Sequence, residues 1–342
     1  MREALQNKLL AFIAHPKASD FERLALEVVR YQAQHLPPYG RLVEARGGDL
    51  SDWRSAPCVP TELFRDIDLC SAEPEQPLSA EFLTSGTTTG RRGRRRVPDL
   101  TLYHAGMMAP FVAHVLGGDT TPRHWLSLVP KPEEDPASSL SHMVGALGER
   151  LSDTLTWVMT PQGLDIDAAS AFIQGQGEPL IIMTTAFALI HWLDGAADSL
   201  TSLPAGSRMM LTGGYKGRAR SLEEPELLAL IKHGLGLEAE AVVPEYGMTE
   251  LTSQAYGRPF EAPPWLRLRV VDPLSGEDLP QGEEGLVAFF DLLNLDNVSA
   301  LLTGDLGRLD EEGRLELHGR APGALLRGCS LSAEELGVLG QP

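Results

Sequence analysis

The chain has 342 residues, of which 43% are hydrophobic and 22% are charged, and its formal net charge is −18 at pH 7. This composition is ordinary for a globular protein with a large core, and the length predicts two or three structural units. The acidic excess argues against general affinity for nucleic acids or for anionic membranes.

Targeting and disulfide signals are not expected in this sequence. The amino-terminal residues carry no basic stretch followed by a long apolar run, so no signal peptide is expected. The most apolar window, residues 180–193, contains polar residues and is too short to span a bilayer. Cys58, Cys70 and Cys329 are an odd number of cysteines without metal-ligand spacing. We therefore expect no disulfide framework, no zinc site, no membrane partner and a cytoplasmic location.

The first predicted element in chain order is a helix over Ser19–Leu36. Its apolar residues fall on one face, and Ser19 with Glu22 offers a capping box at its start. Prolines punctuate the chain from there as far as Pro77. We expect residues 1–80 to form an amino-terminal helical segment that packs on the core.

From about residue 80, short apolar runs alternate with helical patterns, which is typical of βαβ units and a mostly parallel sheet flanked by helices. Strands are predicted over His124–Val129, Thr154–Met159, Leu180–Thr185, Arg208–Thr212 and Ala239–Val243. Helices are predicted over Ser139–Glu149, Ala168–Ile173 and Glu224–His233.

After Pro264 the pattern changes to antiparallel signals. Strands are predicted over Leu266–Val271 and Gly285–Leu293, and a hairpin over Gly307–His318. The predicted fold class is therefore α/β, with a smaller antiparallel or barrel-like part in the last third of the chain.

Residues Thr84–Gly93 form a segment rich in glycine and threonine. Glycines let the backbone fold tightly, so that its amides and hydroxyls can surround phosphate oxygens. It is not a Walker loop, because no Gly-Lys-Ser/Thr closes it. A polar surface hairpin is the alternative. The arginines among residues 91–96 either add charge to a phosphate site, or form a solvated turn or a nucleic-acid patch.

The segment Glu245–Glu250, with the sequence EYGMTE, directly follows the predicted strand Ala239–Val243. Loops at the carboxyl ends of parallel strands are where such sheets bind ligands. An aromatic ring can stack on a purine, and a carboxylate can hold the Mg²⁺ that accompanies a triphosphate. The alternative is a helix start that Thr249 and Glu250 merely cap.

Three shorter motifs follow the same pattern of a turn after a strand. Leu211–Arg218 contains two adjacent glycines that would let a flat base approach the backbone, or that form an ordinary turn. Thr303–Asp305 places a carboxylate beside a tight turn, where it can accept both hydroxyls of a ribose. Gly319 and Arg320 end the predicted hairpin, where a solvated arginine is the alternative. Only the order and spacing of the motifs together are decisive.

In that order the motifs resemble those of the adenylate-forming superfamily, which includes acyl-CoA synthetases, firefly luciferase and the adenylation domains of nonribosomal peptide synthetases. The resemblance covers residues 80–320 and implies that ATP and Mg²⁺ are used, with Glu250 as the metal ligand. It also implies that His142 borders the substrate carboxylate, although a core histidine is the alternative. The implied ATP-phosphate contacts are Thr84, Ser85, Gly86, Thr87, Thr88, Thr89, Gly90 and Arg92. The implied adenine and ribose contacts are Gly213, Gly214, Tyr215, Glu245, Tyr246, Gly247, Met248, Thr249 and Asp305.

Two departures from the superfamily narrow the resemblance. The phosphate segment has the extra Thr89, and arginines where Pro-Lys is common. The superfamily adds a carboxyl-terminal domain with a catalytic lysine, whereas few residues follow Arg320 and no lysine follows Lys232. We therefore expect that domain to be truncated, with an ATP- and acyl-binding core over residues 80–318 and a short tail over residues 319–342.

These features are similar to the acyl-protein synthetases, the LuxE-type ligases of bacterial luminescence, in which a cysteine near the carboxyl terminus accepts the acyl group. Cys329 stands where that cysteine is expected. The resemblance implies activation of a small carboxylic acid, fatty or aryl, to acyl-AMP, transfer to Cys329, and delivery to a partner, either a reductase or a carrier protein. Lys216 and Arg320 are candidate catalytic cations.

Two alternatives stay open. One is a ligase that loads coenzyme A or a carrier protein, similar to phenylacetate-CoA ligases. The other is a degenerate, non-catalytic nucleotide-binding protein.

Overall fold

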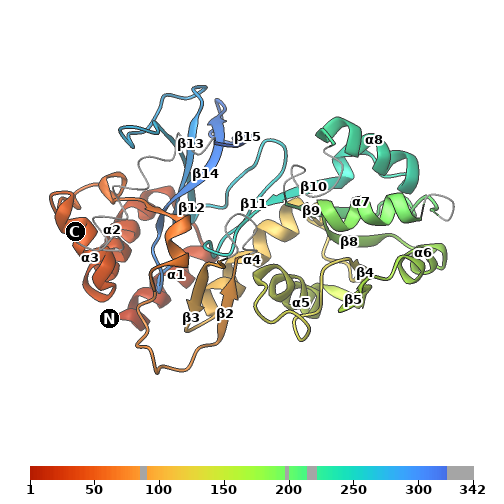
Figure 1. Ribbon diagram of the computed structural model, residues 1–342, viewed down its shortest axis with the longest axis horizontal. Helices are drawn as coiled ribbons and strands as arrows, with labels where there is room; N and C mark the ends of the chain where they lie inside the picture. Colours follow the sequence, from red (N-terminus) through yellow and green to blue (C-terminus); the bar gives the residue numbers. More distant parts are fainter. Residues whose placement is uncertain (85–90, 197–199, 214–221, 322–342) are drawn as a thin grey trace. The chain divides into compact units, whose positions relative to one another are not determined.

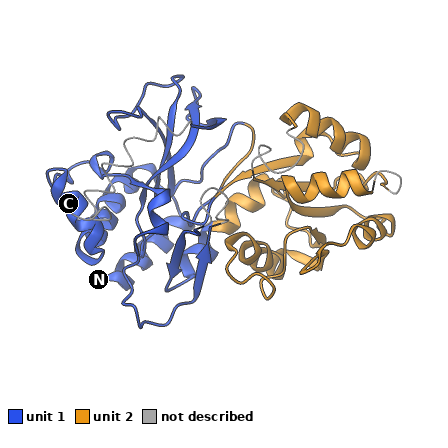
Figure 2. Ribbon diagram, viewed as in Figure 1, with its two compact units in different colours: residues 1–106, 248–254, 259–342 blue, residues 107–247, 255–258 orange. Residues whose placement is uncertain are grey.

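The computed structural model describes residues 1–84, 91–196, 200–213 and 222–321. The chain divides into two compact units (Figure 2). Unit 1 comprises residues 1–106, 248–254 and 259–342, and unit 2 comprises residues 107–247 and 255–258. Helix α4 (Thr101–His114) begins in unit 1 and ends in unit 2. The chain therefore enters and leaves unit 2 twice.

Unit 2 is built on a six-stranded sheet with the strand order β11-β10-β9-β8-β4-β5 (Figure 1). All neighbouring strands are parallel except the edge strand β11, which is antiparallel to β10. The strands are β4 (Arg123–Ser127), β5 (Ser152–Trp157), β8 (Leu180–Thr185), β9 (Arg208–Thr212), β10 (Val242–Tyr246) and β11 (Ala255–Tyr256), with a small hairpin of β6 (Met159–Thr160) and β7 (Gly163–Leu164). The helices are α5 (Ser139–Leu151), α6 (Ile166–Gln174), α7 (Ala186–Gly195), α8 (Glu224–Leu235) and the 3₁₀ turn η3 (Ala239–Ala241).

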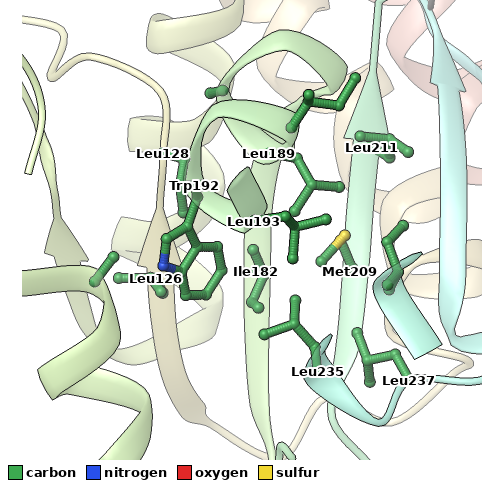
Figure 3. Packing of buried hydrophobic residues seen from close by; sticks show 14 of the residues in the cluster. Leu126, Leu128, Ile182, Leu189, Trp192, Leu193, Met209, Leu211, Leu235 and Leu237 are labelled. Atoms are coloured by element: carbon green, nitrogen blue, oxygen red, sulfur yellow. The ribbon is translucent and has the colours of Figure 1, made fainter. Parts of the chain in front are cut away.

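The central strands of this sheet are buried on both faces, which is why they appear in the sequence as continuous apolar runs. Helices α6, α7 and α8 contribute to one core cluster with the sheet, in which Trp192 of α7 packs beside Leu126 and Ile182 (Figure 3). On β4 the preceding residue, Trp125, contacts Phe111 of α4, with ring centroids 5.4 Å apart. Alternate residues of one strand thus serve two core layers.

Unit 1 contains a five-stranded, mainly antiparallel sheet with the order β1-β14-β13-β12, in which β15 also pairs with β14. Only the β1–β14 pair is parallel. The strands are β1 (Val59–Pro60), β12 (Leu266–Val271), β13 (Gly285–Asp291), β14 (Ala300–Leu309) and β15 (Leu315–Arg320), with a separate hairpin of β2 (Ala80–Leu83) and β3 (Arg94–Val97). The helices are α1 (Arg2–Ala14), α2 (Ala18–His35), α3 (Pro37–Ala45) and the 3₁₀ turns η1 (Trp53–Ser55) and η2 (Thr61–Arg65).

The predicted fold class is confirmed: one mainly parallel sheet with helices and a smaller antiparallel sheet. Strands β8, β9 and β12 have the predicted bounds. The capping box of Ser19 and Glu22 is wrong, because α2 begins at Ala18 with Lys17 at the N-cap position and no side-chain cap. Ser19 therefore lies inside the first turn.

The predicted strand Ala239–Val243 is also corrected. Residues Ala239–Ala241 form a 3₁₀ turn, and β10 begins at the β-branched Val242. The strand continues through Pro244, whose carbonyl oxygen accepts a hydrogen bond from the Gly257 amide at 3.0 Å. Consequently Glu245 and Tyr246 are the last two residues of the strand and do not belong to the loop after it.

Among the helices that the structure describes, none is both long and apolar enough to cross a membrane.

Gln32 joins α2 to the segment after β13. Its side-chain amide donates to the carbonyl oxygens of Asn294 and Asn297 at 2.9 and 2.5 Å, and its side-chain oxygen accepts from the Ser299 amide at 3.1 Å. All these groups are buried. Removing this side-chain amide therefore leaves several buried polar groups without a hydrogen-bond partner.

We expect Gln32→Leu, which removes these bonds at similar volume, to lower the free energy of unfolding by about 2–3 kcal/mol, because the orphaned groups keep their desolvation cost. Urea denaturation of the full chain measures this. Gln34→Leu is the matched control, since Gln34 is exposed on the same helix and its replacement should change stability by less than about 0.5 kcal/mol. Equal effects of the two substitutions would contradict the assignment.

Candidate active site

Two of the predicted motifs meet at the carboxyl edge of the parallel sheet in unit 2. Thr212 ends β9, and Glu245 of β10 lies opposite it in the register. The Thr212 hydroxyl donates a hydrogen bond to a Glu245 carboxylate oxygen. Gly213 follows with a φ of 86°, a left-handed conformation that favours glycine. Tyr246, half-buried, is the next residue of β10. This edge therefore combines a carboxyl, a hydroxyl and an aromatic ring beside an open glycine backbone.

Glu245 is buried, with 7% of its surface exposed. Burial raises the pKa of its carboxyl to about 7, although the hydrogen bond from Thr212 lowers it. At neutral pH the group can therefore both donate and accept a hydrogen bond, which suits the mixed donors and acceptors of a purine edge.

His142 lies in the first turn of α5 and is half-buried. Ser138 caps this helix, because its hydroxyl oxygen accepts a hydrogen bond from the Ser141 amide at 3.1 Å. Helix α5 follows β4, which is separated from β10 by β8 and β9 in the sheet. His142 thus belongs to the same unit as Glu245 but to a helix that follows a different strand.

The chain passes from unit 2 into unit 1 after Gly247. Met248 and Thr249 are half-buried, and Glu250 begins a run of buried residues. The Asn294 side-chain amide donates to the Glu250 carbonyl oxygen at 2.9 Å. The Asp291 carboxylate accepts hydrogen bonds from the main-chain amides of residues 252 and 253, at 3.0 and 2.8 Å. Because hydrogen bonds to buried main-chain groups favour one arrangement, these contacts hold the main chain around Glu250 in place.

The Glu250 side chain is also buried, with 7% of its surface exposed. Burial raises the pKa of its carboxyl to about 7, opposed by the positive charges of Arg95 and Arg320. A buried carboxylate of this kind gains from an added cation. No group of three or more His, Cys, Asp or Glu side chains suited to a metal occurs among the described residues. One carboxylate fits Mg²⁺, which keeps water and substrate phosphates as its other ligands.

Asp305 and Arg320 lie opposite each other on β14 and β15. The Arg320 Nε lies 3.0 Å from an Asp305 carboxylate oxygen, and the arginine side chain is 75% exposed. Asp305 itself is buried, and its amide donates to the Thr303 hydroxyl at 3.1 Å. Because the arginine of this pair is exposed to solvent, a ligand with hydrogen-bond donors can take its place at the Asp305 carboxylate.

The base of the predicted phosphate loop is closed at Thr84. The Thr84 amide donates to the Gly93 carbonyl oxygen at 2.9 Å, and the Gly93 amide donates to the Thr84 hydroxyl at 2.7 Å. Arg92 donates to the carbonyl oxygens of Thr84 and Leu83 at 2.6 and 3.2 Å. The loop therefore starts and ends on hairpin β2–β3.

The arginine run of residues 91–96 is engaged within unit 1. Arg95 and Arg96 are buried, with exposed fractions of 3% and 5%. Arg91 pairs with Asp66, and Arg94 lies 3.8 Å from the carboxylates of Asp68 and Glu81. These contacts hold the hairpin and its surroundings.

Several predicted site residues lie outside the described part of the chain. They are Ser85, Gly86, Thr87, Thr88, Thr89 and Gly90 of the phosphate loop, Gly214, Tyr215 and Lys216 after β9, and Cys329 in the tail.

Sequence reasoning missed Asp291, Asn294 and the positioning contacts of Arg95. The available signal was the appearance of Asp291 and Asn294 inside an otherwise apolar run, residues 285–295. Polar residues in such a run are buried and must be hydrogen-bonded to something specific. Their partners, however, are distant in the sequence.

Comparison with known proteins supports the fold. No protein-family model matches the chain. Over 138 residues it is 27% identical to the long-chain-fatty-acid–luciferin-component ligase of Vibrio harveyi, a match that covers 37% of this chain and 36% of the relative. The matched part is thus about a third of that protein's length.

Solved structures give the same picture. An open conformation of 2-hydroxyisobutyryl-CoA ligase in complex with 2-HIB-AMP and CoA matches with a TM-score of 0.65, 17% identity, and coverage of 89% of this chain and 76% of that one. ATP-bound MatB from Rhodopseudomonas palustris matches with a TM-score of 0.51, 19% identity, and coverage of 72% and 49%. The amide bond synthetase McbA from Marinactinospora thermotolerans matches with a TM-score of 0.50, 20% identity, and coverage of 72% and 50%. The chain has the fold of adenylate-forming enzymes and spans about half the length of the last two.

The raised pKa of Glu245 makes stability depend on pH. The folded protein binds the proton more tightly than the unfolded chain does, so this carboxyl contributes less stability as pH rises from about 4.5 to about 7. Glu245→Gln removes the dependence. We expect the stability difference between variant and wild type to shift in favour of the variant by about 3 kcal/mol across that window.

Chemical denaturation at a series of pH values measures this difference. Glu240→Gln is the control, because Glu240 is exposed in the neighbouring turn η3 and its replacement should give a flat difference. A flat profile for Glu245→Gln as well would show that Glu245 keeps an ordinary pKa.

Proposed function

We propose that this chain activates a small carboxylic acid with ATP, forming an acyl-adenylate and pyrophosphate, and then transfers the acyl group to a thiol. The observation that carries the proposal is the segment Glu245–Glu250. On the fold of adenylate-forming enzymes, its two carboxyl groups are buried with pKa values of about 7. A buried carboxyl at the carboxyl end of a parallel strand, as Glu245 is, suits ligand binding better than stability.

We assign the candidate nucleotide contacts separately for the two units. In unit 2, Tyr246 stacks on adenine, and Glu245 binds its polar edge beside Gly213. In unit 1, Asp305 accepts the ribose hydroxyls in place of Arg320, and the loop that starts at Thr84 surrounds the phosphates. Mg²⁺, held by Glu250, would neutralise the phosphate charge that develops as pyrophosphate leaves.

The chemistry then needs alignment more than a protein nucleophile. A carboxylate oxygen of the acid attacks the α-phosphorus, the bond to the pyrophosphate oxygen breaks, and pyrophosphate leaves. In the second step a thiolate attacks the acyl carbon of the mixed anhydride, and AMP leaves. His142 borders the acid, and Lys216 and Arg320 supply positive charge to the phosphates.

The acyl acceptor is the finer part of the proposal. We assign it to Cys329, with later delivery to a reductase or carrier protein, on the resemblance to the luminescence ligase. Cys58 and Cys70 are less suitable, since burial raises the pKa of both thiols, that of Cys70 to about 11. The thiolate is the nucleophilic form. The likeness to a CoA ligase makes coenzyme A the second candidate acceptor.

The exchange of radiolabelled pyrophosphate into ATP, measured with a panel of fatty and aromatic acids, tests the first step. We expect acid-dependent exchange by the wild type and a loss of about 100-fold in Glu250→Gln, because a metal ligand is removed. Glu261→Gln, at an exposed glutamate of unit 1, should exchange normally. A wild type that exchanges with no acid in the panel would contradict the proposal.

The second step is tested by covalent labelling. Cys329→Ser should abolish the stable acyl-protein, detected by intact mass, while pyrophosphate exchange survives. Cys58→Ser and Cys70→Ser should both keep the label. If Cys329→Ser still accumulates the acyl-protein, the thiol has been misassigned. If only added coenzyme A becomes acylated, the acceptor is coenzyme A.

A further inference from the structure

Arg95 is a buried arginine that the proposed chemistry does not use directly. One terminal nitrogen of its guanidinium donates to the carbonyl oxygens of Thr249 and Leu251, at 3.2 and 2.7 Å. The other donates to the Thr252 hydroxyl and to the Asn294 side-chain oxygen, the latter at 3.1 Å. The carbonyl contacts fall on the residues immediately before and after Glu250. The guanidinium therefore bonds to the main chain on both sides of the predicted metal ligand.

Arg95 also belongs to the hairpin that carries the predicted phosphate loop. It lies on β3, two residues after Gly93, which closes the loop base with Thr84. Its partner across the hairpin is Phe82, two residues before Thr84. A shift of the loop base along the hairpin would therefore move Arg95, and with it the carbonyl groups that flank Glu250.

The second independent observation is the charge of this side chain. Arg95 is 3% exposed, and the ion pairs of the described residues do not include it. Its bonds go to neutral acceptors, and its Nε has no hydrogen-bond partner among the described residues. Burial lowers the pKa of Arg95, although the carboxyl groups of Asp291 and Glu250 favour its charge without forming a direct ion pair. A guanidinium buried in this way is costly, so packing alone does not account for it.

We propose that Arg95 is a positioning residue. It holds the hairpin β2–β3, which carries the predicted phosphate loop, in a fixed position relative to the segment around Glu250, so that the triphosphate and its metal ion bind together. This inference rests on the proposed function. Arginine suits the role because its planar fork presents five donors in a fixed geometry. Lysine keeps the charge but cannot reach the acceptors on both sides of the fork at once.

Arg96 provides a matched control on the same strand. It is also buried, but it pairs with Asp68 at 2.9 Å and donates to the carbonyl oxygens of Ala72 and Glu73. None of these partners lies near Glu250 in the chain. A lysine at position 96 therefore tests the loss of a buried arginine without the link to the metal ligand.

The experiment compares R95K and R96K in the full chain. For each we would measure the KM for MgATP and for the acid in pyrophosphate exchange, and the affinity for Mn²⁺ with and without ATP by electron paramagnetic resonance. We expect R95K to raise the KM for MgATP and weaken ATP-dependent Mn²⁺ binding by about 10- to 100-fold, with the KM for the acid unchanged. R96K should leave all three values within about twofold, because the partners of the Arg96 side chain lie outside the segment around Glu250 and distant contacts rarely couple.

Thr252→Val is the second variant, in case R95K does not fold. It removes one acceptor of the guanidinium at similar volume and should raise the KM for MgATP in the same direction, whereas Thr252→Ser should restore it. Equal effects of R95K and R96K, or a rise in the acid KM alone, would overturn the inference. A wild type that lacks exchange but binds Mn²⁺ only with ATP would contradict the proposed function. The Mn²⁺ affinities of R95K and R96K would then still decide the inference about Arg95.

Discussion

A main-chain polar group that is buried without a hydrogen-bond partner costs about 1–3 kcal/mol. The segment of unit 1 around Glu250 would incur this cost at several residues if side chains did not supply partners. Residues 250–254 are buried but belong to no helix or strand. Their amides and carbonyls therefore cannot be paired by a regular ladder. Side chains from β3 and from the end of β13 supply the missing partners, so the shape of this segment depends on the sheet and the hairpin of unit 1.

The same requirement explains the unusual electrostatics of the two candidate ligands. The polar partners reach the main chain of the segment, but they leave the carboxyl groups of Glu245 and Glu250 in poorly hydrated surroundings. A carboxyl in such a place is balanced near neutrality between its two protonation states. It is therefore sensitive to whatever approaches it: a hydrogen-bonding base in unit 2, or a cation in unit 1. The residues that hold the main chain of the segment are therefore different from the two glutamates whose carboxyl groups change protonation state.

Much of the fold could be predicted from the sequence because burial on both faces leaves a local mark. The continuous apolar run of β8 and the alternation in β12 each specify a strand without reference to any other part of the chain. The motifs around Glu245, Glu250 and Asp305 were found differently, from their residue types and their order along the chain. Arg95 and Asn294 were not, because their importance lies in a contact across 199 residues of chain. An arginine in a basic run looks solvated until its distant acceptors are known. The capping box failed for a related reason: a start signal competes with its neighbours, and Lys17 rather than Ser19 stands at the helix boundary.

The path of the chain through unit 2 has a consequence for dissecting the molecule. Strand β11 reaches the sheet only after residues 248–254 have passed through unit 1. A fragment that stopped at residue 247 would keep the helices and the parallel strands but would leave β10 unpaired along one side. Uncovered strand edges recruit other chains, so such a piece would be prone to self-association. The two units are compact, yet neither can be excised by a single cut, and a circular permutation would preserve the sheet better than a truncation.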